Sequence, residues 1–434
     1  MSIKRGPNIA RNNLVFAYDI ADRINSFIGE PTTNLANNLT NMGPSNSYIP
    51  VNTAAHSNIV QESTSIIQPP IKNLTVWKIY DSNPDGYSRF GIGQNGNVTI
   101  ASFGAYDVTY VASIYVYIPS AVQLGGAVNC WATQNSTGVD WHTGNYSTPN
   151  PTYGYYSWDI NTLNSEANLN IRDQWQRIFV RFTTSSIVRA YGGADNCKYL
   201  TVQFRPNLIG QNGSSFIYVS GFQLEQKSYP TPFSFSNRSV TQGLLNLYNN
   251  SNTIDLTNAG FDSSGNLYFN GSSNYIPVNQ TLSTPITVSG YAKYTDQSKS
   301  YNSFFNGYPH NTLAISLNRN GAGNLVVYIG NGSTWLGTPS ITSSSTVSVN
   351  TWYHITFTSD GITSILYLNG VNVGTSSNVP SGWGNYNYFG HLTGGVSSSE
   401  YFKGYINNAQ IYNTALSAVE VLNNYKSTKS RFGL

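Results

Sequence analysis

Residues 364–374 read SILYLNGVNVG, and this stretch decides the fold class. Short runs of Ile, Leu, Tyr and Val lie on both sides of Asn369-Gly370. A type I′ turn needs positive φ at both central residues, which Asn and Gly adopt at little cost. The stretch therefore predicts two antiparallel strands joined by a tight hairpin.

The same pattern extends outward from this hairpin through the chain. Runs of apolar and aromatic residues alternate with clusters of Asn, Ser, Thr and Gly, which is typical of short strands and turns. Residues 108–118 (VTYVASIYVYI) alternate most clearly. The predicted strands are 14–20, 108–118, 177–183, 216–224, 267–269, 286–294, 313–317, 325–329, 353–358, 364–368 and 409–412.

One helix is expected near the C-terminus. Ser417 and Glu420 have the spacing of a capping box, in which each side chain accepts a hydrogen bond from the other residue's backbone N–H. The sequence therefore predicts an all-β protein of two antiparallel β-sandwich or jelly-roll domains, with one short C-terminal helix.

Composition narrows the class of protein. The chain has 434 residues, of which 14% are aromatic and only 9% charged. Disordered chains have the opposite balance, so extensive disorder is excluded. The net charge of +3 with no basic block argues against a nucleic-acid partner. No apolar run approaches the roughly 18 residues of a membrane span, so membrane insertion is not expected.

Shifts in composition suggest the domain boundaries. Residues 31–75 are rich in Asn, Thr, Ser and Pro and read as a linker or extended segment. Residues 76–237 then form a first jelly roll and residues 238–434 a second. Residues 1–30 are either an N-terminal arm or an edge strand of the second sandwich.

The inventory of reactive groups argues against an enzyme. No two of the five histidines have the i,i+2 or i,i+4 spacing of a metal pair, and only six Glu are present. Glycosidases need two carboxylates about 5–10 Å apart, and no predicted strand carries such a pair. Acids from separate strands could still converge, so a polysaccharide depolymerase stays open as an alternative.

Aromatic side chains in loop-like sequence are the main functional signal. Sugar rings stack on Trp and Tyr, while amides and carboxylates bind the hydroxyls. The alternative for each ring is that it closes the end of a sandwich or packs in an oligomer interface. The candidate carbohydrate-binding residues are Trp131, Trp141, Tyr153, Tyr155, Tyr156, Trp158, Trp335, Trp383, Tyr386 and Tyr388.

The second half resembles concanavalin A-like, laminin-G-type jelly rolls. The matching runs, in order, are LYFNG (267–271), YIPV (275–278), ITVSGYAKY (286–294), WYHITF (352–357), LYLNG (366–370), GYI (404–406) and IYNTALS (411–417). Asn407 and Asn408 stand where the family often has Asp-Glu, so a carboxylate site there is in doubt. The resemblance implies binding rather than hydrolysis.

The first half resembles carbohydrate-binding-module jelly rolls and virion proteins of tailed bacteriophages. Its matching runs are NLVFAYDI (13–20), GEPTTN (29–34), WQR (175–177), IYVSGFQLE (217–225), YPTP (229–232) and RSVTQGLL (238–245). In related single domains, a run like 13–20 belongs to the laminin-G-type sheet. The resemblance therefore implies a discontinuous domain in which residues 31–237 are an insertion.

These observations predict a non-enzymatic phage virion protein that binds host-surface polysaccharide. It would be a head-fibre, decoration or tail-fibre component, made in the host cytoplasm without a signal peptide and located on the virion surface. Capsid or tail proteins are its expected partners, and the habit of phage fibres suggests a homotrimer. The resemblance also implies room for a structural Ca²⁺. The alternative function is a purely structural capsid or tail cement protein.

Overall fold

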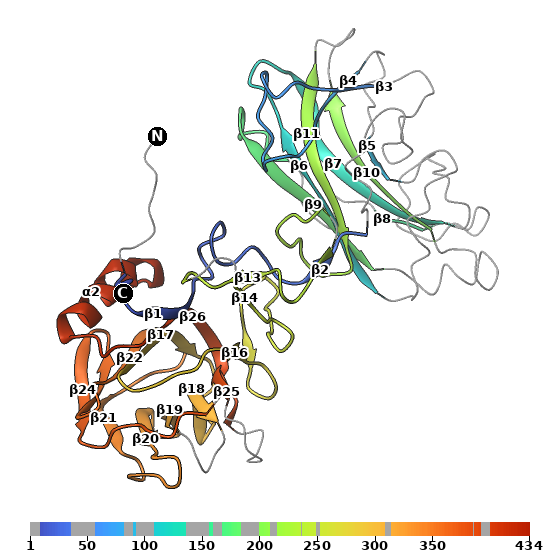
Figure 1. Cartoon of the computed structure of the whole chain (residues 1–434). Helices are drawn as coiled ribbons and strands as arrows, with labels where there is room; N and C mark the ends of the chain where they lie inside the picture. Colours follow the sequence, from blue (N-terminus) through green and yellow to red (C-terminus); the bar gives the residue numbers. More distant parts are fainter. Residues whose placement is uncertain are drawn as a thin grey trace. The chain divides into compact units, whose positions relative to one another are not determined.

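The computed structural model describes 13 stretches of the chain (Figure 1). They are residues 9–35, 57–81, 90–92, 108–135, 156–158, 167–183, 199–208, 215–235, 237–248, 252–308, 314–384, 386–391 and 400–434. The chain divides into two compact units, each considered by itself. Unit 1 comprises Met1–Pro31 and Arg238–Leu434, and unit 2 comprises Thr32–Asn237.

Unit 1 is built on a seven-stranded antiparallel sheet. Its order is β1-β26-β17-β22-β23-β24, and β15 also pairs with β26. The strands are β1 (Leu14–Tyr18), β15 (Phe269–Asn270), β17 (Ile286–Tyr294), β22 (Trp352–Ser359), β23 (Ser364–Leu368), β24 (Val371–Ser376) and β26 (Lys403–Tyr412).

A six-stranded sheet forms the second layer of unit 1. Its order is β16-β25-β18-β19-β20-β21. The strands are β16 (Ile276–Val278), β18 (Tyr301–Tyr308), β19 (Ile315–Asn320), β20 (Asn324–Ile329), β21 (Ile341–Thr346) and β25 (Tyr386–Phe389). A two-stranded sheet of β13 (Leu244–Leu245) and β14 (Thr253–Ile254) lies beside β16. At the boundary between the units in the sequence, β12 (Asn237–Arg238) pairs with β2 (Thr32–Thr33).

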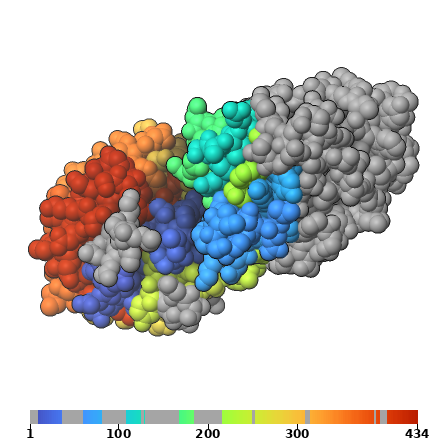
Figure 2. All heavy atoms as spheres, turned by 90° about the horizontal axis from the view of Figure 1, so that it is seen from above, coloured from blue at the N-terminus to red at the C-terminus, as the bar shows by residue number. Residues whose placement is uncertain are grey.

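The N-terminal strand β1 lies at the edge of the seven-stranded sheet. It pairs antiparallel with β26, from Leu14 opposite Tyr412 to Tyr18 opposite Ala409. Figure 1 shows β1 in dark blue next to β26, and in Figure 2 dark-blue N-terminal residues are visible on the surface near the red C-terminal segment. Phe16 and Tyr18 are buried in the core between the sheets, so β1 contributes aromatic rings as well as backbone hydrogen bonds.

The C-terminal helix α2 (Ala418–Thr428) covers part of the outer face of the seven-stranded sheet, and the 3₁₀ helix η5 (Lys429–Phe432) follows it. The Ser417 side chain accepts from the Glu420 N–H, and the Glu420 carboxylate accepts from the Ser417 N–H. The predicted capping box is thus confirmed. A membrane-spanning helix is not found in the described part of the chain.

The hairpin at Asn369-Gly370 has the predicted geometry. Both residues have positive φ, 51° and 79°, and they join β23 to β24. Strand ends differ from the predicted ranges: β26 begins at Lys403 rather than at 409, and β1 ends at Tyr18 rather than at 20. Within this strand, Asn408 adopts a φ of 51° and the register with β17 shifts between Asn407 and Gln410. The polar pair is therefore a β-bulge inside a strand.

Unit 2 contains a five-stranded sheet, β3-β4-β11-β6-β9, and a four-stranded sheet, β5-β10-β7-β8. β3 comes from residues 57–61, inside the segment predicted as a linker, and it pairs with β4. The strands are β3 (Ser57–Gln61), β4 (Val76–Asp81), β5 (Phe90–Ile92), β6 (Thr109–Tyr117), β7 (Leu124–Asn135), β8 (Tyr156–Trp158), β9 (Trp175–Thr183), β10 (Tyr199–Leu208) and β11 (Phe216–Glu225). The prediction of an all-β chain of antiparallel sheets with a short C-terminal helix is confirmed.

Candidate functional site

The structure places the predicted aromatic residues in several different settings. Trp141, Tyr153 and Tyr155 lie outside the described residues. For four others only the backbone is described: Trp131 on β7, Tyr156 and Trp158 on β8, and Tyr386 on β25. β8 pairs with β7, with Trp158 opposite Ala132 and Tyr156 opposite Gln134.

The three remaining predicted aromatics are half-buried and have different neighbours. The Trp335 ring lies 5.7 Å from the Tyr328 ring. Trp383 packs against the core, and its indole N–H donates to the Thr284 hydroxyl at 3.1 Å. Tyr388 lies 5.1 Å from Tyr275, ring to ring. Each of these contacts is a packing contact, and none of the three rings lines the pocket described next.

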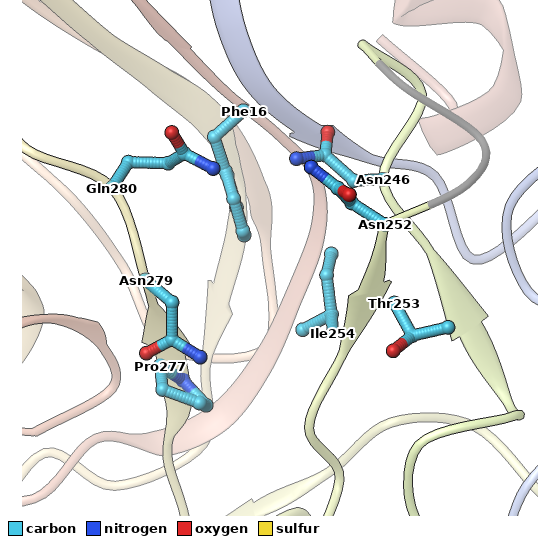
Figure 3. A pocket seen from close by; sticks show the side chains of 8 residues that line it. All are labelled: Phe16, Asn246, Asn252, Thr253, Ile254, Pro277, Asn279 and Gln280. Atoms are coloured by element: carbon cyan, nitrogen blue, oxygen red, sulfur yellow. The ribbon is translucent and has the colours of Figure 1, made fainter.

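A pocket of about 290 Å³ opens in unit 1 between β1, the β13–β14 sheet and the end of β16. Figure 3 shows two groups of side chains facing each other across it, the residues of β13–β14 and those that follow β16. We call it the amide pocket, because half of its lining residues are Asn or Gln. It is lined by Phe16, Asn246, Asn252, Thr253, Ile254, Pro277, Asn279 and Gln280.

The apolar part of the amide pocket belongs to the core of the sandwich. Phe16 and Ile254 are almost fully buried, 2% and 3% exposed. The Phe16 ring is stacked at 6.0 Å on Phe389 of the six-stranded sheet. Because core packing fixes the Phe16 side chain, the pocket has a rigid apolar wall before any ligand arrives.

Asn246 has an orientation that its neighbours dictate. Its side-chain oxygen accepts from the backbone N–H of Ala17 at 3.0 Å and of Tyr248 at 3.1 Å. Both partners are donors, so the oxygen must face them and the Nδ2 group must point elsewhere. Figure 3 shows that this nitrogen is turned toward the pocket. Asn246 therefore offers a pre-positioned donor.

The other three carboxamides line the opening of the amide pocket. Asn252 and Asn279 are exposed and Gln280 is half-buried. In the described structure their side chains make no hydrogen bond, although the backbone oxygen of Gln280 accepts from Asn387 Nδ2 at 3.3 Å and that of Asn252 from the Asn246 N–H at 2.9 Å. Pro277 is on β16, an edge strand, where its missing N–H costs no ladder hydrogen bond.

The chemistry of the amide pocket follows from this lining. Each carboxamide can donate and accept, whereas Phe16, Ile254 and Pro277 present apolar surface. No lining residue is ionisable, so the pocket has no catalytic acid or base and no fixed charge. The arrangement suits an uncharged ligand that carries both hydroxyl groups and C–H surface.

Sequence reasoning missed every residue of the amide pocket. The lining comes from three distant segments, around residue 16, 246–254 and 277–280, that only the fold brings together. Asn and Gln are also common throughout the chain, so none of them stands out. The one available signal was the clustering of Asn in LYNNSN (247–252) beside a short apolar run.

A second polar region lies beneath α2, and we call it the α2-covered face. It consists of Ser289, Tyr291, His354, Thr356 and Tyr412 on the outer face of the seven-stranded sheet. Ser289 Oγ lies 3.1 Å from His354 Nε2 and 2.7 Å from Thr356 Oγ1. Burial lowers the pKa of His354 to about 3, so this imidazole is neutral. The Ser–His pair is enclosed and cannot meet a substrate.

The described structure contains no candidate metal centre. There, no group of three or more His, Cys, Asp or Glu side chains is placed to hold a metal ion. The Ca²⁺ implied by the sequence resemblance therefore stays a prediction without a ligand set.

The two packed antiparallel sheets of unit 1 form a β-sandwich. Residues 261–422 match the family model of the concanavalin A-like lectin/glucanases superfamily, so unit 1 contains a laminin-G-type domain of that superfamily. This confirms the resemblance of the second half, and the fold is compatible with glycan binding. Comparison with curated proteins gives no match.

Solved structures similar to this chain include three sugar-related or lectin-like proteins. Domain 4 of an extracellular arabinanase from Geobacillus stearothermophilus, solved with arabinotriose, is 24% identical over 41% of this chain and 83% of its own, with a TM-score of 0.32. A heptameric SAP-like pentraxin from Limulus polyphemus is 21% identical over 36% and 78%, with a TM-score of 0.30. A Trypanosoma rangeli sialidase is 13% identical over 44% of this chain, with a TM-score of 0.34, and the match spans 31% of its length.

Proposed function

We propose that unit 1 binds a neutral sugar in the amide pocket. The observation that carries this proposal is the lining of the pocket, in which four uncharged carboxamide side chains lie beside apolar residues. Hydroxyl groups of a sugar both donate and accept, and the amides match both roles. The C–H face of the sugar ring would lie against Pro277, the apolar lining residue that keeps part of its surface exposed.

The size of the pocket suggests one sugar residue as the ligand. Its volume of about 290 Å³ lies at the lower end of small-ligand sites, which span roughly 300–1,000 Å³. A single residue bound by a few amides gives weak affinity. Display of many copies on one particle would raise the avidity by about 10²–10⁴.

Substitutions at the rim of the amide pocket test the proposal. The immobilised chain would be measured against a panel of neutral glycans, at high surface density. We expect Asn279→Ala and Gln280→Ala each to weaken binding roughly three- to tenfold, the worth of one neutral hydrogen bond. Gln297→Ala is the matched control, because Gln297 is exposed and does not line the pocket.

Two results would contradict the proposal. One is the absence of binding to any neutral glycan at high density. The other is equal binding by the rim variants and the control. Either result, with a folded protein, would favour the purely structural role.

We further propose that the chain is a non-enzymatic component of a tailed-phage virion, displayed on its surface with capsid or tail proteins as partners. The support is the resemblance of residues 13–34 and 217–245 to such proteins. A pocket lining without a carboxylate supports the non-enzymatic role.

Immunogold labelling of purified particles tests the location, and an assay for new reducing ends on host polysaccharide tests for a depolymerase. Unlabelled particles or released reducing ends would overturn these proposals.

A further inference from the structure

Beyond the end of α2, the outer face of the seven-stranded sheet carries a row of three side chains. Lys293 on β17 is opposite Trp352 on β22 and opposite Tyr405 on β26. Directly opposed residues of antiparallel strands share one face of a sheet. We call this group the Lys293 row.

The ammonium group of Lys293 lies between the two rings. Its Nζ is 5.3 Å from the centroid of the Trp352 ring and 4.5 Å from that of Tyr405. These are cation–π distances. The ion pairs Lys403–Asp296 and Arg431–Asp19 do not involve Lys293, which has no carboxylate partner among the residues that the structure describes. Its donors are therefore available to a ligand.

The helical cover ends just before the Lys293 row. Phe432 of η5 is stacked at 3.9 Å on Tyr291, which belongs to the next row of the sheet, and lies 4.9 Å from the Trp352 ring. Tyr291 is fully buried, whereas all three members of the Lys293 row keep part of their surface exposed. The Lys293 row is thus partly exposed to solvent, whereas η5 covers Tyr291 in the neighbouring row of the sheet.

The carboxylates nearest to the row already have partners. Asp262 accepts from the Tyr405 hydroxyl at 3.1 Å and from the backbone N–H groups of Ser264 and Asn266. Asp296 accepts from Ser298 and is paired with Lys403 at 3.1 Å. The local carboxylates therefore have hydrogen-bond or ion-pair partners other than Lys293, and Lys293 forms no ion pair with either of them.

We propose that the Lys293 row binds an acidic residue of a saccharide, such as a uronic acid. The ligand carboxylate accepts from Lys293 Nζ, and the apolar face of its ring lies on Trp352 or Tyr405. Aromatic walls reduce the local dielectric, which strengthens the ammonium–carboxylate contact. This site differs from the amide pocket in place and in charge, so it stands whether or not the pocket binds sugar.

The test compares three probes on the full chain: tetragalacturonate, a neutral tetrasaccharide of galactose, and poly-glutamate. We expect tetragalacturonate to bind more tightly than the other two. Its affinity should fall as ionic strength rises from about 0.05 to 1 M, because the Debye length drops to about 3 Å. Lys293→Met keeps an unbranched side chain between the rings but removes the charge, and should weaken binding at least tenfold.

Lys78→Met is the matched control. Lys78 Nζ lies 4.0 Å from the Phe216 ring and 5.7 Å from the Tyr80 ring, a similar two-ring setting on a sheet of unit 2. Its substitution should leave the affinity for tetragalacturonate unchanged. Equal losses in both Lys variants would overturn the proposal, and so would equal binding of poly-glutamate. Unchanged binding by a folded Lys293→Met variant would also overturn it.

Discussion

Polar side chains line both the α2-covered face and the amide pocket. Those beneath α2 are hydrogen-bonded within the protein, whereas most of those in the amide pocket make no side-chain hydrogen bond. Beneath α2, the Tyr291 hydroxyl donates to the Tyr425 carbonyl and accepts from Thr428, both at 2.9 Å. Asn424 donates to the Tyr412 hydroxyl at 3.1 Å. In the amide pocket, the side chains of Asn252, Asn279 and Gln280 make no such bonds within the described structure.

This difference separates a structural region from a binding region. Buried polar groups are nearly always paired, because an unpaired one costs about 1–3 kcal/mol. Polar groups that remain unpaired at a solvent-filled concavity can bind a ligand without first breaking a protein contact. A polar surface therefore indicates a site only after its internal partners have been counted.

The largest expected effect concerns the α2-covered face. Tyr291 is fully buried, stacked on Phe432, and bonded to α2 through its hydroxyl. Tyr291→Ala should lower the free energy of unfolding by about 3–5 kcal/mol, the range for truncating a buried aromatic ring. Chemical denaturation followed by fluorescence measures this loss.

Tyr291→Phe separates the ring from the hydroxyl. It keeps the stack and removes one of the two donors to the Tyr425 carbonyl, which still accepts from the Lys429 N–H, so we expect a loss of about 1 kcal/mol. Both variants should bind neutral sugar normally at temperatures where they are folded. Impaired sugar binding by a folded variant would break the proposed separation of the two regions.

The second-largest expected effect is a decrease in the free energy of unfolding in mild acid. His354 is 2% exposed, and burial lowers its pKa from the usual 6.5 to about 3. Between these values the unfolded chain binds a proton at His354 and the folded chain does not, so stability falls as pH drops below about 6.5. From pH 7 to pH 5 this one group removes about 2 kcal/mol.

His354→Gln isolates that contribution. Denaturation curves at pH 7 and pH 5 should show a smaller pH-dependent loss in the variant, by about 2 kcal/mol. His391, whose pKa burial lowers to about 4, contributes its own loss and remains in the variant. If the wild-type protein and the variant lost the same free energy of unfolding between pH 7 and pH 5, His354 would be protonated as readily in the folded protein as in the unfolded chain. The α2-covered face would then accommodate a charged imidazole.

Local signals in the sequence were sufficient for much of the fold. Asn369-Gly370 specifies its hairpin through backbone conformation alone, and Ser417 with Glu420 specifies the helix start through two hydrogen bonds. Such features need no distant partner. Strand ends were less predictable, because the bulge at Asn408 depends on how β17 pairs with β26.

The candidate site could not be predicted in the same way. Asn246 is informative only because its oxygen faces Ala17, a residue 229 positions away. Trp383 drew attention as a ring in a loop, but its indole N–H bonds Thr284 and its ring packs on the core. Residue type suggested sugar binding, whereas the partners of each side chain depend on long-range contacts that only the fold creates.

A third prediction concerns the amide pocket alone. Gln280→Glu keeps the shape of the side chain but replaces its NH₂ donor with a carboxylate oxygen, so a sugar hydroxyl loses its donor. We expect neutral sugar binding at pH 7 to weaken about tenfold, with the melting temperature nearly unchanged. Gln297→Glu introduces the same charge away from the pocket and should bind normally. Equal weakening in both variants would point to net charge rather than the pocket.

The smallest effect expected is at the start of α2. Ser417→Ala removes the side chain that accepts from the Glu420 N–H, and N-cap losses of this kind cost about 1 kcal/mol. The helix should fray at its first turn while Tyr425, Thr428 and Phe432 hold its other end against the sheet. If the α2-covered face were a concealed glycan site, this loosening would increase sugar binding. We expect no increase in a glycan-binding assay, because the Ser289 hydroxyl is already bonded to His354 and Thr356.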